Sequence, residues 1–340
     1  MMVSAKTPKK LEVNFFHRNS RCGFSIYKVF GTIEKELFKR VEVVDFFMPS
    51  HKSMPWDIIR NSIYTFKHRN KKDINHISGH IHDVILGLIG CKTVLTIHDL
   101  VFIDNVRNPI KKFYKWLFWL YIPVKLADKV TCISNETKRK VLQHINTDKI
   151  EVIYNPIDPS FKYVSKAFDE DCPIILHIGT FWNKNLERTI YALEGIKCHL
   201  KIIGDIDTHI LQLLESKRIN FSNAKNLTDE AIRQEYINCD IVNFPSIYEG
   251  FGMPIIEGQQ TGRVVVASKI APLTEISGDA VIYVDPYDIA SMHEAYLTAI
   301  TNGEMREKYI SKGLENVKRF QVDNIANQYM RIYKELFELD

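Results

Sequence analysis

The stretch that decides the fold is residues 245–257, Pro-Ser-Ile-Tyr-Glu-Gly-Phe-Gly-Met-Pro-Ile-Ile-Glu. It follows the largely apolar residues 240–244, which have the composition of a strand buried on both faces. Pro254 suits the first turn of a helix, because its missing N–H would have no partner there. The stretch is therefore expected to connect a strand to a helix, and such units build parallel α/β sheets.

The same stretch has the features of a ligand site. Gly250 and Gly252 let a ligand approach the backbone closely, and the free N–H groups at the helix start form an anion site suited to a diphosphate. Glu249 in the loop and Glu257 one turn into the helix can accept paired hydrogen bonds from the vicinal hydroxyls of a ribose or a hexose. Taken alone, however, the spacing of the two glutamates indicates only a tight connection with two solvated carboxylates.

Short apolar runs alternate with helical patterns on both sides of this stretch. Strands are expected at residues 13–16, 41–47, 74–77, 92–97, 129–133 and 150–153, and again at 173–179, 199–204, 240–244, 264–267 and 280–284. Helices are expected at 25–40, 84–89, 136–145, 186–194, 229–238 and 254–260, followed by two closing helices at 288–314 and 323–338. This alternation predicts two Rossmann-like, doubly wound parallel-sheet domains that face each other across a cleft, with ligands at the carboxyl ends of the strands.

Two prolines and an acidic cluster within residues 155–171 predict the boundary between the domains. We expect an N-terminal domain at 1–160, with a C-terminal helix at about 323–340 packed back on it, and a C-terminal domain at 161–322. Residues 1–171 hold 28 Lys and Arg against 18 Asp and Glu, a charge of +10, and the remaining residues hold 17 against 23, a charge of −6. The basic half predicts an anionic partner: a phospholipid surface, a lipid-phosphate acceptor or a nucleic acid.

The full string Pro-Ser-x-x-Glu-Gly-Phe-Gly-x-Pro-x-x-Glu resembles the retaining glycosyltransferases of family 4 (glycosyl transferases group 1), which have the GT-B fold. The resemblance runs from about residue 74 to residue 287. It is also seen at residues 178–186, 204–205, 226–230 and 271–280, and in the N-terminal half at 95–100 and 152–158. It implies an enzyme that transfers a hexose from a nucleotide-diphosphate sugar, with an N-terminal acceptor-binding domain and a C-terminal donor-binding domain.

The family's site residues carry over to positions of this chain. The resemblance implies that Lys184 neutralises the donor diphosphate, that Glu257 holds the ribose, and that His98 reaches the transferred sugar across the cleft. Glu249 is expected to meet the sugar and phosphate, and to be catalytic together with Lys184 and His98. The other donor-binding positions are Gly179, Thr180, Asn185, Leu227, Gly250, Phe251, Gly252, Met253 and Pro254. From spacing alone, Lys184 is equally well explained as an exposed loop lysine, and His98 is more often a structural histidine.

The resemblance also implies a mechanism. The anomeric configuration is retained in a front-side, oxocarbenium-like reaction in which the departing diphosphate helps deprotonate the acceptor hydroxyl, without a metal or a cofactor. The acceptor is expected to be a saccharide or a lipid-linked saccharide of bacterial surface polysaccharide synthesis. Two other classes stay open: another GT-B enzyme, such as a sugar-nucleotide epimerase or a phosphorylase, and a non-catalytic nucleotide-sugar-binding protein.

Two positions depart from the family's pattern. An arginine often lies near the phosphate lysine, but Asn183 precedes Lys184 here, so the second positive charge must come from elsewhere, and Arg21 is the candidate. The early N-terminal loop often has paired glycines, whereas this chain has only Cys22-Gly23, which makes Gly23 the candidate for that loop.

His76, His80, His82 and Asp83 form a dense polar cluster after a predicted strand. Histidine and carboxylate ligands suit zinc, but polar residues at strand ends are also common in binding loops. Acceptor binding by His80 and His82 is therefore favoured over a metal site.

Residues 111–121 combine lysines with aromatic side chains. This pattern is as typical of a helix at a membrane interface as of a core helix with a basic outer face. No window reaches the roughly 18 apolar residues of a spanning helix, the six scattered cysteines are typical of a reducing compartment, and no nucleic-acid fold signature is present. We expect a cytoplasmic protein without a nucleic-acid partner, in peripheral contact with an anionic membrane at its inner face through the basic N-terminal half.

Overall fold

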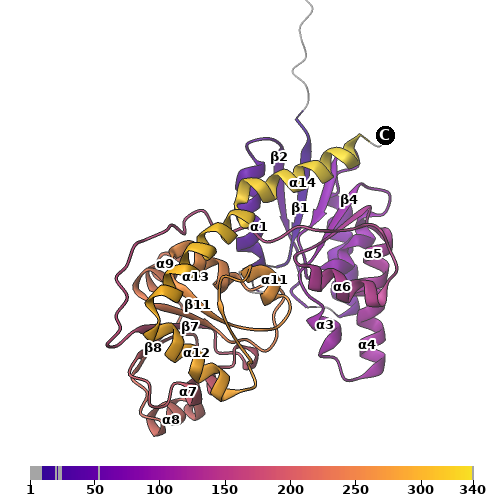
Figure 1. Cartoon of the computed structure of the whole chain (residues 1–340). Helices are drawn as coiled ribbons and strands as arrows, with labels where there is room; N and C mark the ends of the chain where they lie inside the picture. The colour runs from indigo at the N-terminus through magenta and orange to yellow at the C-terminus, as the bar shows by residue number, and fades with distance from the viewer. Residues whose placement is uncertain (1–9, 20, 22–24, 53, 339–340) are drawn as a thin grey trace, which may run out of the picture. The chain divides into compact units, whose positions relative to one another are not determined.

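The computed structural model describes residues 10–19, 21, 25–52 and 54–338, and it divides the chain into two compact units (Figure 1). The first unit comprises Met1–Pro156 and Val322–Asp340, and the second comprises Ile157–Gln321. The chain therefore crosses between the units twice, once at residues 156 and 157 and once at residues 321 and 322.

The first unit contains a six-stranded sheet in the order β2-β1-β3-β4-β5-β6, and every neighbouring pair is parallel. Its strands are β1 (Glu12–His17), β2 (Glu42–Phe47), β3 (Ile74–Ile77), β4 (Thr93–Ile97), β5 (Lys129–Cys132) and β6 (Ile150–Val152). Its helices are α1 (Ser25–Leu37), α2 (Pro55–His68), η1 (His82–Leu88), α3 (Val101–Asp104), α4 (Pro109–Trp116), η2 (Leu117–Tyr121), α5 (Ile122–Leu126), α6 (Asn135–His144) and α14 (Val322–Phe337).

The second unit contains a six-stranded parallel sheet in the order β12-β11-β10-β7-β8-β9. Its strands are β7 (Ile174–Ile178), β8 (His199–Ile203), β9 (Phe221–Ala224), β10 (Ile241–Phe244), β11 (Val264–Ser268) and β12 (Ile282–Val284). Its helices are η3 (Trp182–Lys184), α7 (Leu186–Ala192), α8 (Thr208–Ser216), α9 (Asp229–Asn238), α10 (Met253–Thr261), α11 (Leu273–Ser277), α12 (Ile289–Thr301), α13 (Gly303–Asn316) and η4 (Val317–Phe320).

Both sheets have a point at which the strand order reverses. In the second unit it lies between β7 and β10, and in the first unit between β1 and β3. Loops that leave neighbouring strands at such a point diverge to opposite faces of the sheet, and the crevice between them is the usual ligand site of open α/β sheets. The topology thus marks one candidate crevice in each unit.

The first sheet is buried on both faces. Val13 and Phe15 of β1 pack with α1 and α14 on one face, whereas Phe16 packs with η1, α5 and α6 on the other, because successive side chains of a strand point to opposite sides. The helix α14 lies next to α1 (Figure 1) and buries a stripe of side chains at helical spacing: Ile325, Tyr329, Ile332, Tyr333 and Leu336.

The sequence-based prediction of two parallel-sheet α/β domains is confirmed. Ser134 caps α6, since its Oγ accepts a hydrogen bond from the Thr137 N–H at 3.1 Å. The predicted set of elements omitted β9, α8, α2, α3 and α5. β9 is an edge strand with the polar centre Ser222-Asn223, so its apolar pattern is weak.

Candidate functional site

The candidate site in the second unit is formed by the two loops that leave β7 and β10 at the reversal point. The backbone N–H of Ile247 donates to the Asn183 carbonyl at 2.9 Å, and the Asn183 side-chain amide donates to the Tyr248 carbonyl at 3.0 Å. The side-chain amide of Asn185 is buried and donates to the carbonyls of Pro245 and Pro286, at 3.0 and 2.7 Å. The two loops are therefore joined by hydrogen bonds into one surface. Asn185, a predicted donor-binding residue, uses its side-chain amide to hold these loops together.

Lys184 and Glu249 meet on this surface. Lys184 Nζ lies 2.5 Å from Glu249 Oε1 and 4.7 Å from the ring centroid of Phe244, at the end of β10. The two side chains are 20% and 14% exposed, so the pair is shielded but still reachable by a ligand. A diphosphate that approached this position would compete with Glu249 for the ammonium group.

Gly179 makes room for the lysine. It adopts a φ of +91°, and a Cβ atom built on it would lie 3.0 Å from Lys184 Cγ. The aliphatic stem of Lys184 thus crosses directly over the Gly179 backbone. Thr180 packs against Gly204 at the end of β8, where an added Cβ would lie 2.8 Å from Thr180 Cγ2.

The loop from β10 ends at the amino terminus of α10. Gly252 has a φ of +116° and precedes the helix, whose first residues are Met253 and Pro254. Phe251 is buried, and its ring packs edge-on against Phe320 at 5.8 Å between centroids. The Phe251 side chain thus anchors the loop inside the unit.

Glu257 is held by a residue that the sequence reasoning did not find. The Tyr236 hydroxyl, at the last turn of α9, donates to Glu257 Oε2 at 2.5 Å. Tyr236 is fully buried and packs edge-on against Phe161. Burial, together with the charge of Glu257, raises the pKa of Tyr236 well above its usual value, so the hydroxyl stays a donor at physiological pH.

A buried polar network supports the lysine from the sheet side. The Asn243 side-chain amide donates to His177 Nδ1 in β7 at 3.0 Å, and the Tyr296 hydroxyl donates to Asn243 Oδ1 at 2.8 Å. Burial, assisted by the charge of Lys184, lowers the pKa of His177 to about 3. His177 is therefore neutral and adds no positive charge next to Lys184.

Leu227, a predicted donor-binding residue, lies between β9 and α9 and is partly exposed. It follows Asn226, which has a φ of +55°, and precedes Thr228, which caps α9 by accepting from the Ala231 N–H at 3.2 Å. Its role in donor binding stays a prediction.

In the first unit, His98, His80 and Asp99 come together at the carboxyl ends of β3 and β4. His98 Nε2 lies 2.7 Å from the Ser78 carbonyl, and its ring is 6.0 Å from that of His80. Burial and the neighbouring His80 lower the pKa of His98 to about 4, so this imidazole is neutral and donates through Nε2. Gly79 is required here, because a Cβ atom would lie 2.3 Å from His98 Cδ2.

The histidine cluster of the sequence does not form one site. His82 is buried and lies 2.7 Å from the Trp119 carbonyl, and burial lowers its pKa to about 3. His76 points into the opposite face of the sheet, where its nitrogens lie 2.6 Å from the Tyr333 hydroxyl and 2.8 Å from Thr96 Oγ1. The ring of His80 lies 6.0 Å from that of His98 and 6.4 Å from that of His82. The pairing of His80 with His82 as acceptor ligands stays a prediction.

The predicted phosphate-loop residues lie after β1. Arg21 is exposed, and its backbone N–H donates to Asn19 Oδ1 at 3.1 Å. Gly23 lies outside the described residues. The assignment of Arg21 as the second positive charge stays a prediction.

A hollow of about 150 Å³ occupies the reversal point of the first sheet. It is lined by residues that follow β1, β2 and β3, and by residues of α2, η1 and η2: Arg18, Asn19, Ser50, His51, Lys52, Asn61, His80, Ile81, Asp83 and Trp119. Among the residues that line it, the basic side chains are accompanied by one carboxyl group, that of Asp83. Burial raises the pKa of Asp83 to about 6. The hollow is therefore suited to an anionic or hydroxyl-rich ligand.

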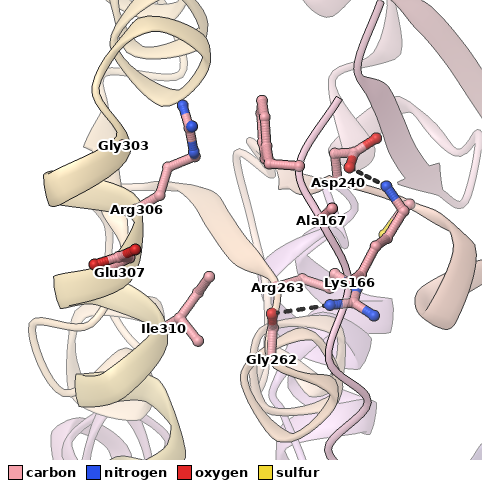
Figure 2. Close-up of a pocket in the computed structure, with 11 residues that line it drawn as sticks. Lys166, Ala167, Asp240, Gly262, Arg263, Gly303, Arg306, Glu307 and Ile310 are labelled. Atoms are coloured by element: carbon pink, nitrogen blue, oxygen red, sulfur yellow. Dashed lines mark hydrogen bonds and ion pairs between the residues drawn. The ribbon is translucent and has the colours of Figure 1, made fainter. Parts of the chain in front are cut away.

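A larger hollow of about 320 Å³ lies at the other end of the second sheet, next to Asp240 and Arg263, which precede β10 and β11 (Figure 2). Lys166 pairs with Asp240, and the buried guanidinium of Arg263 donates to the carbonyls of Tyr236, Gly262, Val164 and Ile237. These charged groups hold residues 163–169 against the sheet. The hollow therefore lies where this segment packs at the amino ends of the strands, away from the loops that carry Lys184 and Glu249.

Comparisons with known proteins agree with this arrangement. The family model for glycosyl transferases group 1 matches residues 161–316, and the model for glycosyltransferase family 4 matches residues 21–161. The chain is 23% identical to O-antigen chain mannosyltransferase B of Escherichia coli, over 72% of this chain and 71% of that protein. It is 26% identical to O-antigen chain mannosyltransferase RfbU of Salmonella typhimurium, over 68% and 66%.

Solved structures show the same fold. Sucrose-phosphate synthase from Thermosynechococcus elongatus matches with a TM-score of 0.79 at 18% identity, over 97% of this chain and all of that one. WaaG, a glycosyltransferase involved in lipopolysaccharide biosynthesis, matches with a TM-score of 0.70 at 13% identity, over 94% and 99%. Together with the two family models, these matches show that the chain belongs to the family 4 glycosyltransferases and has the GT-B fold.

Proposed function

We propose that this glycosyltransferase is a retaining, metal-independent hexosyltransferase that uses a nucleotide-diphosphate sugar. Its acceptor is a saccharide or lipid-linked saccharide of bacterial surface polysaccharide synthesis. The observation that carries the proposal is the Lys184–Glu249 pair on the braced loops of the second unit, close in sequence to the amino terminus of α10. The names of the O-antigen mannosyltransferase relatives support the acceptor class.

Each group of the second unit has a separate task in this proposal. The ammonium of Lys184 and the positive end of the α10 helix dipole stabilise the diphosphate as negative charge develops on it. Glu257, oriented by Tyr236, accepts hydrogen bonds from the ribose hydroxyls. Glu249 exchanges its contact with Lys184 for the hydroxyls of the transferred sugar.

The reaction breaks the bond between the anomeric carbon and the diphosphate oxygen and forms a bond from the same face to the acceptor oxygen. The acceptor proton passes to the departing diphosphate, which is why no carboxylate pair of the glycosidase type is required. His98, neutral and held through Nε2 by the Ser78 carbonyl, is proposed to contact the transferred sugar. Charge neutralisation by Lys184 and the helix terminus takes the place of a metal ion and of any cofactor.

The hollow of the first unit is the proposed acceptor site. Arg18, His51 and Lys52 line it and provide positive charge for a phosphate or an acidic sugar, and Asp83 can accept from a hydroxyl. The basic N-terminal half gives the enzyme a peripheral contact with an anionic membrane at the cytoplasmic face, which would bring it to a lipid-borne acceptor.

Single substitutions at the donor site test the proposal. Lys184→Ala and Glu257→Gln should each lower kcat/KM for transfer by about 100-fold or more, because each removes a charged contact with the donor. Lys217→Ala is the matched control, since Lys217 also pairs with a glutamate, Glu194, at 2.8 Å, but lies at the end of α8 outside both loops. Transfer that survives both substitutions unchanged would refute the site.

The stereochemistry and the reaction class are read from the products. Proton NMR of the first-formed product should show the anomeric configuration of the donor, with and without EDTA. An epimerised nucleotide sugar formed without acceptor, a sugar phosphate formed with inorganic phosphate, or inversion at the anomeric carbon would each replace the proposal with another activity.

A further inference from the structure

The helix α2 has two contrasting faces. Ile58, Asn61 and Thr65 are buried against the unit, as their spacing on one side of a helix requires. On the other side, Trp56, Ile59, Ile63 and Phe66 are exposed, by 80%, 48%, 51% and 53%. We name these four residues the α2 stripe. They recur at intervals of three and four residues, so they form one continuous apolar strip about 15 Å long.

The α2 stripe is bordered by positive charge. Arg60 and Lys67 are exposed and follow the stripe along one edge, and the Arg69 guanidinium lies over the Phe66 ring at 3.6 Å. Residues 51–72 contain six Lys and Arg against one acidic residue, Asp57, a net charge of +5. Asp57 is turned away from the stripe, because its carboxylate accepts from Ser50 Oγ and from the Met54 N–H.

Helix α4 has the same character. Ile110 and Phe113 are 79% and 60% exposed, and Lys111 and Lys112 lie between them in sequence. The first unit thus has a second helix with exposed apolar and basic side chains.

We propose that the α2 stripe is the surface through which this protein docks on an anionic phospholipid bilayer. An amphipathic helix with Trp, Phe and aliphatic residues on one face and Lys or Arg at its edge inserts that face at the level of the lipid headgroups. The absence of an outward-facing acidic group on α2 fits a negatively charged surface. No helix among the described residues is long and apolar enough to span a bilayer, so the contact is peripheral.

The inner side of the same helix borders the hollow of the first unit. Asn61 lines that hollow, and its amide and carbonyl groups bond Ser50, which lines it too. A bilayer on the outer side of α2 would therefore place its headgroups next to the hollow. This link to a lipid-borne acceptor rests on the proposed function, whereas docking itself involves no residue of the donor site.

The test is cosedimentation of the full chain, without donor or acceptor, with two kinds of vesicle: phosphatidylcholine alone, and phosphatidylcholine with about one-third phosphatidylglycerol. The wild type should bind the anionic vesicles and not the neutral ones, and Trp56 fluorescence should shift to the blue on binding, because the ring leaves water. Raising the salt concentration should weaken binding, since the cations contribute through screened charge.

Two double variants separate the apolar contribution to vesicle binding from the charged contribution. Ile63→Glu/Phe66→Glu and Arg60→Glu/Lys67→Glu should each reduce binding to anionic vesicles by at least tenfold. Phe38→Glu and Lys35→Glu/Lys39→Glu are the matched controls, because these residues are exposed at the end of α1, which packs on the opposite face of the first sheet. Circular dichroism and thermal unfolding verify that all variants are folded.

The outcomes are distinct. Glu257→Gln should bind vesicles like the wild type, so a failed donor site and a failed docking surface give different results. Binding that is equal in the α2 stripe variants and the controls would overturn the proposal. So would a dimer, detected by light scattering, that Ile63→Glu/Phe66→Glu dissociates, because the stripe would then be a protein interface.

Discussion

At the scale of single residues, the carboxylate of Glu257 depends on a partner 21 positions away in the chain, Tyr236. The hydroxyl is buried and stays protonated, so it fixes one carboxylate oxygen of Glu257. A hydrogen bond to a charged group contributes about 1.5–3 kcal/mol when it is fully used. Tyr236 is therefore a positioning residue, whose effect on a ligand passes through Glu257.

Tyr236→Phe should raise the KM for the nucleotide sugar by about tenfold and change kcat by less than about threefold, because a mobile Glu257 weakens binding of the ribose rather than the chemical step. Steady-state kinetics with varied donor concentration checks this. The double variant Tyr236→Phe/Glu257→Gln should be no worse than Glu257→Gln alone. Additive losses would show that Tyr236 acts independently of Glu257.

His17 is a second residue whose environment sets its charge. Its Nε2 lies 3.1 Å from Glu34 Oε1 and 3.4 Å from Asp45 Oδ1, and its Nδ1 lies 2.9 Å from Ser78 Oγ. Burial lowers the pKa of His17, but the hydrogen bonds to Asp45 and Glu34 outweigh burial and raise it to about 9. The three groups could also hold a metal ion, since their ligand atoms lie within 4.8 Å of one another, but a protonated His17 already accounts for the contacts.

The pKa of His17 predicts a pH dependence of stability. Since the folded pKa exceeds the unfolded value of about 6.5, the contribution is complete below pH 6.5 and is lost as the pH rises toward 9. The free energy of unfolding should fall by about 2 kcal/mol between pH 7 and pH 9 in urea titrations, and less in His17→Gln. His209→Gln, at an exposed position of α8, should keep the wild-type slope. An unchanged slope in His17→Gln would disprove the assignment.

At the scale of elements, the proposed donor site consists of two loops that are braced by backbone and amide hydrogen bonds. Such bracing reduces the loss of conformational freedom on binding. The loop from β7 to α7 depends on Gly179, whose positive φ and missing side chain let Lys184 cross it. The lysine is thus positioned by its own loop as well as by Glu249.

Gly179→Ala should lower the affinity for a nucleoside diphosphate by about tenfold, because the new methyl group would displace the stem of Lys184. Gly195→Ala is a matched control: Gly195 has a φ of +82° but no atom within 4 Å of an added Cβ. Both variants should lose about 1–2 kcal/mol of stability through backbone strain. Isothermal titration calorimetry measures the affinity, and an equal affinity in the two variants would contradict the packing argument.

At the scale of the whole molecule, two units with parallel sheets are joined by two crossings of the chain. The donor-site residues Lys184, Glu249 and Glu257 all belong to the second unit, whereas His98 and the basic hollow belong to the first. A nucleoside diphosphate should therefore be recognised by the second unit, and acceptor properties should follow changes in the first.

A screen of nucleoside diphosphates by thermal shift should find at least one that raises the unfolding midpoint, because a ligand at 100 times its Kd adds about 2.7 kcal/mol to the stability of the native state. Hydrogen exchange should then show new protection in residues 179–185 and 245–257. Lys184→Ala should reduce both effects. Protection confined to the first unit would contradict the assignment of the donor site.

The sequence by itself determined the class of fold, because the alternation of apolar strands and amphipathic helices is a local pattern with a fixed period. It also determined that residues 179–185 and 245–257 follow strands and precede helices. Lys184 and Glu249 could be predicted as candidates from these patterns and from the family resemblance, but their contact at 2.5 Å could not. Edge strand β9 escaped prediction because its pattern is polar.

Only the tertiary structure decided which distant residues meet. The order of strands places the loops of β7 and β10 side by side, brings Tyr236 to Glu257, and brings His76 to the Tyr333 hydroxyl of α14. It likewise decided that Ile58 is buried while Ile59 and Ile63, of the same chemistry, face solvent. The physical reason is that hydrophobicity and spacing describe a residue and its neighbours in the chain, whereas burial and hydrogen bonding depend on how the chain folds back on itself.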